Sequence, residues 1–111
     1  MHLTGKTAIV TGGSRGIGRA VALALAEAGA SVAIIYAGNM KAAEETKQAV
    51  EEKGVQAMAI QCDVSDEKAV ADMVKAVKKE WGRVDILVNN AGITQDTLLM
   101  RMTEQQWDQV I

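Results

Sequence analysis

The chain has 111 residues, of which 49% are hydrophobic and 23% charged, and its formal net charge at pH 7 is -2. This balance argues against nucleic acid or an anionic membrane surface as a partner, and no apolar run reaches the roughly 18 residues of a membrane span. The single cysteine, Cys62, excludes an internal disulfide and fits a reducing compartment. We therefore expect a cytoplasmic globular domain.

Short apolar runs alternate with longer amphipathic stretches along the chain. The runs at 7–10, 31–36, 56–60 and 86–88 are continuous rather than alternating in polarity, which is typical of strands covered on both faces. Three helical patterns lie between them. The first has Ile17 on its apolar face, and the third has Ser65 as its expected N-cap. The helices are expected to end at glycines 29, 54 and 82.

Regular alternation of strands and helices predicts right-handed crossovers and a parallel sheet. We expect an α/β fold, a Rossmann-like three-layer sandwich with a parallel sheet of about four strands in the order 3-2-1-4. A capping box at Thr103 and Gln106 predicts a fourth helix from about Glu104, cut off at Ile111. Residues 1–111 are thus expected to form a single truncated domain, the first half of something longer.

A glycine-rich turn, Thr11-Gly12-Gly13-Ser14-Arg15-Gly16-Ile17-Gly18, joins the first strand to the first helix. Backbone N–H groups and the helix dipole at such a turn attract an anion. Gly12 can make the tight turn, Gly16 lets a phosphate approach the backbone, and Gly18 lets the helix pack closely on the strand. The sequence therefore predicts a phosphate-binding turn, and the alternative is a turn that serves packing alone.

The residues after the second strand indicate which nucleotide this is. The segment Tyr36-Ala37-Gly38-Asn39-Met40 contains no carboxylate of the kind that holds the ribose hydroxyls of NAD. Arg15, inside the turn, offers a guanidinium to a 2′-phosphate. This pattern favours NADP over NAD, and the alternative for Arg15 is a solvated surface charge.

A second motif, Asn89-Asn90-Ala91-Gly92, follows the fourth strand. In the order 3-2-1-4 this strand lies beside the first, so the motif borders the same crevice as the glycine-rich turn. The alternative for the two asparagines is a turn in which they satisfy local backbone groups.

These motifs together resemble those of the short-chain dehydrogenase/reductase family. The turn matches the family's T-G-x-x-x-G-x-G, residues 89–92 match its N-N-A-G, and Asp63 matches its adenine-contacting aspartate. Segments 36–39 and 89–102 look like bacterial 3-oxoacyl-acyl-carrier-protein reductases. The resemblance implies NADPH-dependent reduction of a 3-oxoacyl thioester on acyl carrier protein, usually by a homotetramer. The cofactor-binding residues that it implies are Gly12, Ser14, Arg15, Gly16, Ile17, Gly18, Tyr36, Asp63, Val64, Asn89, Ala91 and Gly92.

The family's catalytic Tyr-x-x-x-Lys pair is missing from this chain. Its only tyrosine, Tyr36, has Met40 four residues further on. The serine and asparagine that assist the pair in the family fall downstream of the matched region. No catalytic residue and no metal ligand is therefore assigned. We expect the NADP(H)-binding N-terminal half of such a reductase, inactive on its own.

The alternative is a truncated doubly wound, flavodoxin-like module that associates with itself and has no ligand or activity. In both cases the fourth strand is expected to have a bare edge, which invites pairing with another chain. Trp107 and the 98–102 run add apolar surface near this edge. We therefore expect a homodimer formed through the C-terminal elements of two copies.

Overall fold

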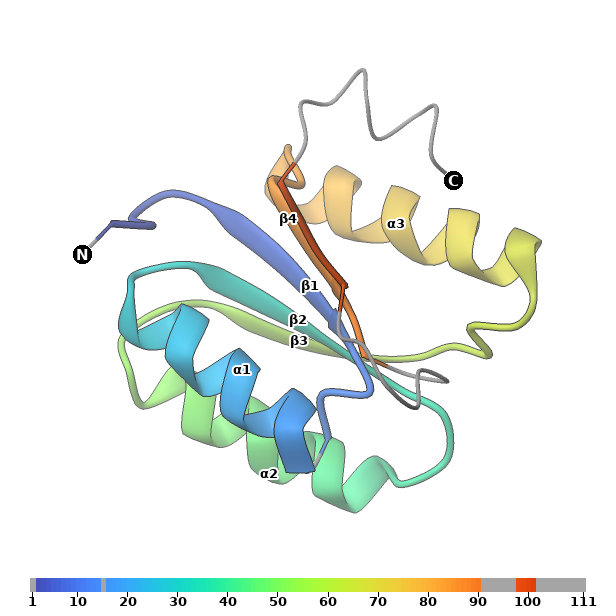
Figure 1. The fold of residues 1–111 in the computed structure, drawn as a ribbon, viewed down its shortest axis with the longest axis horizontal. Coiled ribbons are helices and arrows are strands. Elements are labelled where there is room, and N and C mark those ends of the chain that lie inside the picture. The colour runs from blue at the N-terminus through green and yellow to red at the C-terminus, as the bar shows by residue number, and fades with distance from the viewer. Residues whose placement is uncertain (1, 15, 91–97, 102–111) are drawn as a thin grey trace.

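The computed structural model describes residues 2–14, 16–90 and 98–101 (Figure 1). The strands and helices predicted from the sequence up to residue 89 are confirmed, with boundaries that differ by one or two residues. The expected fourth helix from Glu104 lies outside the described residues. In chain order the elements are β1 (Thr7–Thr11), α1 (Gly16–Glu27), β2 (Ser31–Tyr36), α2 (Met40–Glu51), β3 (Ala57–Gln61), α3 (Glu67–Trp81), β4 (Ile86–Asn89) and β5 (Leu98–Arg101).

The strands form one sheet with the order β3-β2-β1-β4-β5. The first four strands pair in parallel, as predicted. This order differs from the 2-1-3-4-5 order of flavodoxin-like sheets, so the sheet is not the flavodoxin-like one that the alternative named.

The prediction that β4 has a bare edge is also wrong. β5 pairs with it in the antiparallel direction, from Ile86 opposite Arg101 to Asn89 opposite Leu98. The physical reason is that an apolar strand edge with open N–H and C=O groups is a template for a nearby apolar segment of the same chain. In the described sheet the outer strands are therefore β3 and β5.

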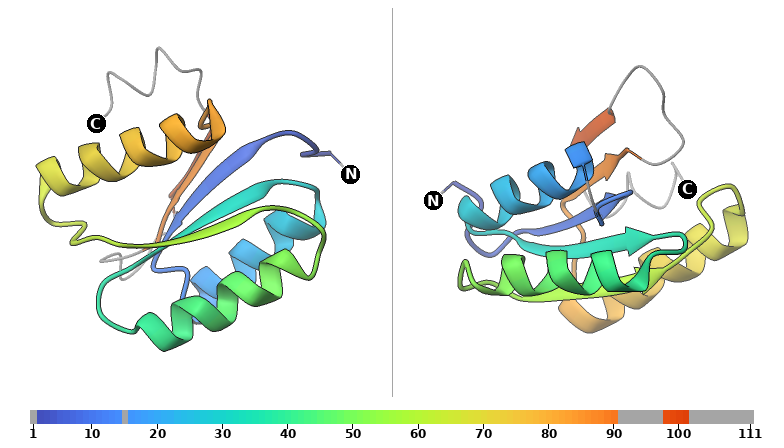
Figure 2. Two further views of the ribbon diagram at one scale, coloured as in Figure 1. Left: turned by 180° about the vertical axis from the view of Figure 1, so that it is seen from behind. Right: turned by 90° about the horizontal axis from the view of Figure 1, so that it is seen from below.

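Helices cover both faces of the sheet, which confirms the three-layer architecture. α1 and α2 lie on one face and α3 on the other (Figures 1 and 2). Successive residues of β1 point to opposite faces, so Ala8 and Val10 pack in the α1–α2 core and Ile9 packs in the α3 core. All five residues of β1 are buried. The central strand is thus shielded from water on both sides.

The buried stripe of α1 differs from the predicted one. Gly18, Ala22 and Ala26 are buried, whereas Ile17 is 68% exposed. Small residues at the contact let the helix axis approach the sheet closely, and the larger side chains flank that contact. Ile17 also lies in the first turn of the helix, beside the end of the sheet. The expectation that it packs in the core is therefore wrong.

The start of α3 also differs from the prediction. Its N-cap is Asp66 rather than Ser65, because the Asp66 carboxylate accepts hydrogen bonds from the backbone N–H groups of Lys68 and Ala69 at 3.0 and 3.3 Å. A negative charge at this position is also favoured by the helix dipole. Gly82 is the left-handed C-cap of α3, as predicted, and glycines 29 and 54 also have positive φ angles just beyond α1 and α2. The C-cap of α2 is Glu52, two residues before Gly54.

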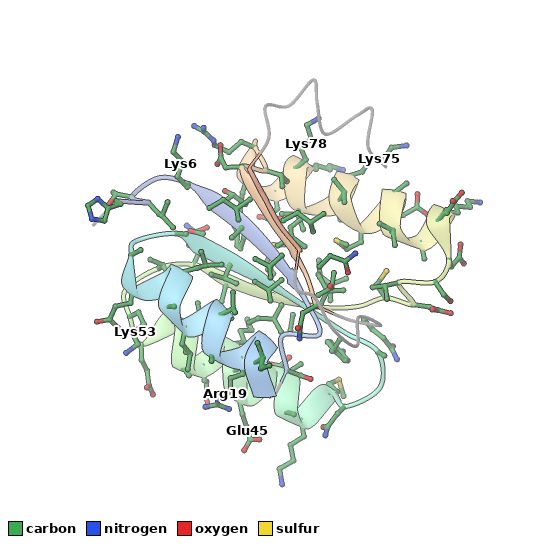
Figure 3. All side chains as sticks on the ribbon, viewed as in Figure 1. Lys6, Arg19, Glu45, Lys53, Lys75 and Lys78 are labelled. Atoms are coloured by element: carbon green, nitrogen blue, oxygen red, sulfur yellow. The ribbon has the colours of Figure 1, made fainter. Side chains whose placement is uncertain are left out.

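The outer faces of the helices carry charge. Lys75 and Lys78 point away from the sheet on α3, and Arg19 and Glu45 point away on the opposite side of the molecule (Figure 3). None of the helices in the described ranges combines the length and apolar character needed to cross a membrane.

Candidate functional site

The sheet order places the ends of β1 and β4 side by side. Thr11, the last residue of β1, is in register with Asn89, the last residue of β4. From this point the chain leaves β1 toward α1, on one face of the sheet, while α3 precedes β4 on the other face (Figure 1). Such a change of side opens a crevice beyond the carboxyl ends of parallel strands, where ligands of open α/β sheets bind.

The glycines of the turn have different physical roles. Gly12 and Gly16 have φ angles of 66° and 64°, which favour glycine over other residues. A side chain on Gly18 would overlap the carbonyl oxygen of Gly12, so only a glycine lets α1 start this close to the turn. A Cβ on Gly16 would meet nothing within 4 Å. The turn thus has no space for a side chain at Gly18, where we call it closed, and has free space beside Gly16, where we call it open.

The two asparagines connect β4 to the turn rather than satisfying only their local backbone. The Thr11 hydroxyl donates to Asn89 Oδ1 at 3.1 Å and accepts from the Asn90 N–H at 2.9 Å. The Asn90 side-chain amide donates to the Gly12 carbonyl at 3.5 Å. The hydroxyl of Thr11 therefore joins the two motifs. Sequence reasoning named Thr11 only as the first residue of the glycine-rich turn.

A further hydrogen bond reaches the turn from α2. The hydroxyl of Thr46 donates to the Ser14 carbonyl at 2.8 Å, and Thr46 is completely buried. Sequence reasoning did not single out Thr46 as a site residue. The one signal that could have singled it out is a hydroxyl among aliphatic residues on a buried face.

Three predicted site residues lie at the ends of β2 and β3. The Cys62 N–H donates to the Tyr36 carbonyl at 2.9 Å, which holds the two strand ends together. Asp63 is exposed, and hydrogen bonds from the Ser65 hydroxyl and backbone N–H to its Oδ1 lower the pKa of this carboxyl. It is therefore a negatively charged acceptor near neutral pH. Val64 is half-buried beside it.

Cys62 itself is buried, and its environment does not favour a thiolate. Burial raises the pKa of the thiol, and the negative charges of Asp63 and Asp66 raise it further. Since the reactive form of a cysteine is the thiolate, Cys62 acts as a small buried apolar residue.

Two large apolar side chains are exposed at the carboxyl end of the sheet. Ile17, in the first turn of α1, and Met40, the first residue of α2, are 68% and 62% exposed. The structure thus brings together Gly12, Ser14, Gly16, Ile17, Gly18 and Asn89. Arg15, Ala91 and Gly92 lie outside the described residues. Within the described ranges, no group of three or more His, Cys, Asp or Glu side chains could hold a metal ion.

Two hollows lie at the opposite end of the sheet, where its strands begin. They have volumes of about 500 and 330 Å³ and share Val55, Gln56 and Trp81. The smaller one also borders Thr7 and Ser31, the first residues of β1 and β2. Because open α/β sheets bind ligands at the carboxyl ends of their strands, we assign the site to the turn and not to these hollows.

The chain has clear relatives among known proteins. Residues 6–111 match the sequence profile of the short chain dehydrogenases. The 3-oxoacyl-[acyl-carrier-protein] reductase FabG of Staphylococcus aureus is 55% identical to it over 106 residues. That match covers 96% of this chain and 43% of the reductase, so the chain spans less than half the length of this relative.

Solved structures show the same fold. A short chain dehydrogenase from Burkholderia cenocepacia in complex with NADP has a TM-score of 0.81 and 49% identity, over 84% of this chain and 38% of that one. NAD+-bound xylitol dehydrogenase has a TM-score of 0.79 and 42% identity, over 84% of this chain and 35% of that one. Since these two neighbours hold different nucleotides, the fold alone does not select between them.

Proposed function

Because this chain belongs to the short-chain dehydrogenase family, we propose that it forms the NADP(H)-binding part of an NADPH-dependent 3-oxoacyl-[acyl-carrier-protein] reductase of fatty acid synthesis. The observation that carries the proposal is the turn between β1 and α1, which is closed at Gly18 and open at Gly16, beside Asn89. The 55% identity to the S. aureus reductase supports the substrate class.

The residues at the crevice fit a dinucleotide. The open position at Gly16 leaves room for a pyrophosphate at the N-terminus of α1, where free N–H groups and the helix dipole favour negative charge. The Asp63 carboxylate, two residues after the end of β3, is the acceptor that we propose for the amino group of adenine. Arg15 is the residue that we propose for the 2′-phosphate. When bound, NADPH supplies the hydride of the reaction.

We further propose that these 111 residues bind the nucleotide without turning over a substrate. A carbonyl reduction needs a proton donor placed beside the substrate oxygen. In this family that role implies a Tyr-x-x-x-Lys pair, and the sequence holds one tyrosine, Tyr36, followed at the fourth position by Met40. Incubation with NADPH and an acetoacetyl thioester should therefore oxidise no more NADPH than a mock preparation does.

Calorimetric titration of the chain tests the choice of nucleotide. NADPH should bind saturably at one site, NADH should bind more weakly, and FMN should give only heats of dilution. Gly16→Val should weaken both NADPH and NADH, because its side chain would occupy the space open to the pyrophosphate. Saturable binding of FMN, or none of NADPH, would contradict the proposal.

Self-association is a separate proposal. In the described sheet β5 has a strand neighbour on one side only, so its outer N–H and C=O groups can pair with a second copy. We propose a cytoplasmic homodimer formed through this edge and the residues that follow it.

A further inference from the structure

β3 forms one side of the described sheet. It pairs in parallel with β2, and no described strand lies beside its other edge. Four of its five residues are half-buried and the fifth is exposed, whereas all five residues of β1 are buried. The proposed function makes no use of this outer edge.

The hydrogen bonds at the two ends of β3 show which backbone groups face outward. The Gln56 carbonyl, just before β3, accepts a hydrogen bond from β2 at 3.1 Å, and the Cys62 N–H, just after it, donates to β2 at 2.9 Å. The even-numbered positions therefore direct their backbone groups to β2. Because this direction alternates from one residue of a strand to the next, the N–H and C=O groups of Ala57, Ala59 and Gln61 face away from the sheet.

Little in the sequence of β3 protects this edge from pairing. Edge strands are often guarded by lysine, proline or a bulge, whereas β3 has the sequence AMAIQ. Two of the three outward-facing residues are alanines, whose methyl groups leave the backbone accessible. The side chain of the third, Gln61, donates to the Ala37 carbonyl at 2.9 Å. The edge is thus a template for a further strand.

A hollow lies at the start of this edge. It is the larger of the two hollows described above, with a volume of about 500 Å³. Its apolar lining consists of Val55, Ala57, Met58 and Trp81. Its two charged lining side chains, Glu51 and Glu80, are both acidic and both belong to exposed residues. A side chain of a strand added to β3 can enter such a hollow, and the charge there favours a basic one.

The ends of two helices add to the negative charge at the hollow. α2 ends at Glu51 and α3 ends one residue after Glu80, since both helices run back from the carboxyl ends to the amino ends of the strands (Figure 1). The C-terminal end of a helix carries partial negative charge. Of the lysines in this region, Lys53 is paired with Glu27 at 3.0 Å, and Lys6 lines the smaller hollow instead.

We propose that the outer edge of β3 binds an extended basic segment of another protein. The segment adds a strand to the sheet through its backbone, and its lysine or arginine enters the larger hollow beside Glu51 and Glu80. There the cation also meets Trp81, and tryptophan is the aromatic side chain that attracts cations most strongly. Main-chain pairing gives such complexes affinity, and the hollow gives them specificity. The hollow lies at the opposite end of the sheet from the glycine-rich turn, so this proposal does not depend on nucleotide binding.

NMR titration of the 15N-labelled chain with the peptide Ac-Val-Thr-Lys-Val-Thr-Val-NH2 tests the proposal. The amide signals of Ala57, Ala59 and Gln61 should shift with one saturation curve, because their outward N–H groups gain acceptors. Those of Met58 and Ile60 should shift less, because their N–H groups already face β2.

Two altered peptides test the interaction without changing the chain. A peptide with glutamate in place of lysine should bind about tenfold more weakly, because attraction to the two carboxylates becomes repulsion. A peptide that is N-methylated at alternate amides should not bind, because the methyl groups block strand pairing.

Substitutions in the hollow test the role of its charge. The double variant Glu51→Gln, Glu80→Gln should raise the dissociation constant of the lysine peptide about fivefold. The matched control is Glu44→Gln, Glu45→Gln, which makes the same change in net charge at exposed positions of α2, with Glu45 pointing away from the sheet (Figure 3). It should change the constant less than about twofold.

Three results would overturn the proposal. The first is equal affinity for the lysine and glutamate peptides, and the second is a set of saturable shifts that leaves out β3. The third is a shift of the outward-facing β3 amides when the chain is concentrated without peptide, since a second copy would then occupy the edge.

Discussion

At the scale of single residues, the site depends on glycines, because the lack of a side chain leaves room for close contacts between backbone segments. Gly18 has no room for a side chain, because a Cβ there would overlap the Gly12 carbonyl and lie 2.9 Å from the side-chain nitrogen of Asn90. Asn90 is itself hydrogen-bonded to Thr11 and to Gly12, so neither neighbour can move alone. The roles of glycines could be predicted from sequence because these constraints are local. The roles of Thr11 and Thr46 could not, because their hydrogen bonds reach residues 32 to 79 positions away.

Gly18→Ala should lower the free energy of unfolding by about 1–3 kcal/mol, since the added methyl forces backbone to shift in a packed region. Urea denaturation measures this loss. Gly38→Ala is a suitable control, because a Cβ on Gly38 would meet nothing within 4 Å and its φ angle is not positive. Equal stability of the two variants would show that α1 can move away from the turn at no cost.

Arg15→Ala should reduce the binding free energy of NADPH by about 1.5–3 kcal/mol and leave that of NADH nearly unchanged, because only NADPH carries the 2′-phosphate. Titration calorimetry with both nucleotides measures the difference. Arg19→Ala, which removes an arginine that points away from the sheet on α1, should leave both affinities as they are (Figure 3). Equal losses for the two nucleotides in Arg15→Ala would refute the assignment.

At the scale of elements, β1 and β4 are joined at both ends. The crevice end is held by Thr11, while at the other end Thr7 and Asp85 exchange two hydrogen bonds of 2.9 Å, one of them to the Asp85 carboxylate. Continuous apolar runs made these strands predictable. β5 was missed because a strand of only four residues, Leu98–Arg101, does not reveal its partner. The Asp66 cap was missed because Ser65 and Asp66 are both good N-caps by residue type.

Asp85 should make the stability of the fold depend on pH in the acid range. Burial alone would raise the pKa of its carboxyl, but hydrogen bonds from Arg83 and from the Thr7 N–H outweigh that effect and lower it. A lowered pKa in the folded state means that the stabilisation is complete above the unfolded-state value of about 4 and disappears as the pH falls below it.

Asp85→Asn should therefore be less stable than the unmodified chain at pH 7, by about 1–3 kcal/mol, and should lose less stability on acidification. Thermal unfolding between about pH 2 and 7 follows both effects. The control is Asp72→Asn on the exposed surface of α3, which should keep the unmodified acid profile. An acid profile of Asp85→Asn that matches that control would contradict the role of this carboxylate.

At the scale of the whole molecule, the proposed site lies at one end of the sheet, and two outer strands form the sides of the described sheet. The carboxyl ends of β1 and β4 form the crevice, and β3 and β5 are the outer strands of the described sheet. The three-layer fold followed from the order of runs along the chain, because parallel crossovers have one preferred hand. The strand order 3-2-1-4 is the usual one for such doubly wound sheets. The pairing of β4 with β5 did not follow in the same way, because the order of runs does not show which short segment meets the open side of a strand.

The homodimer remains a prediction at this scale. Light scattering at about tens of micromolar, where weak dimers form, should give twice the mass of 11.8 kDa. Trp107→Ser should shift the equilibrium toward the monomer, because we expect this residue to be buried between the two copies. A stable monomer, or association unaffected by the substitution, would contradict the prediction.

The most direct test of nucleotide binding at the turn is NMR titration of the 15N-labelled chain with NADP+. The amide signals of Gly12, Ser14, Gly16 and Gly18 should shift together with that of Asp63, all with one saturation curve. The amide signals of Val55, Gln56 and Trp81, at the opposite end of the sheet, should not shift. Shifts confined to that opposite end of the sheet, or no saturable shifts in the turn, would contradict the assignment of the site.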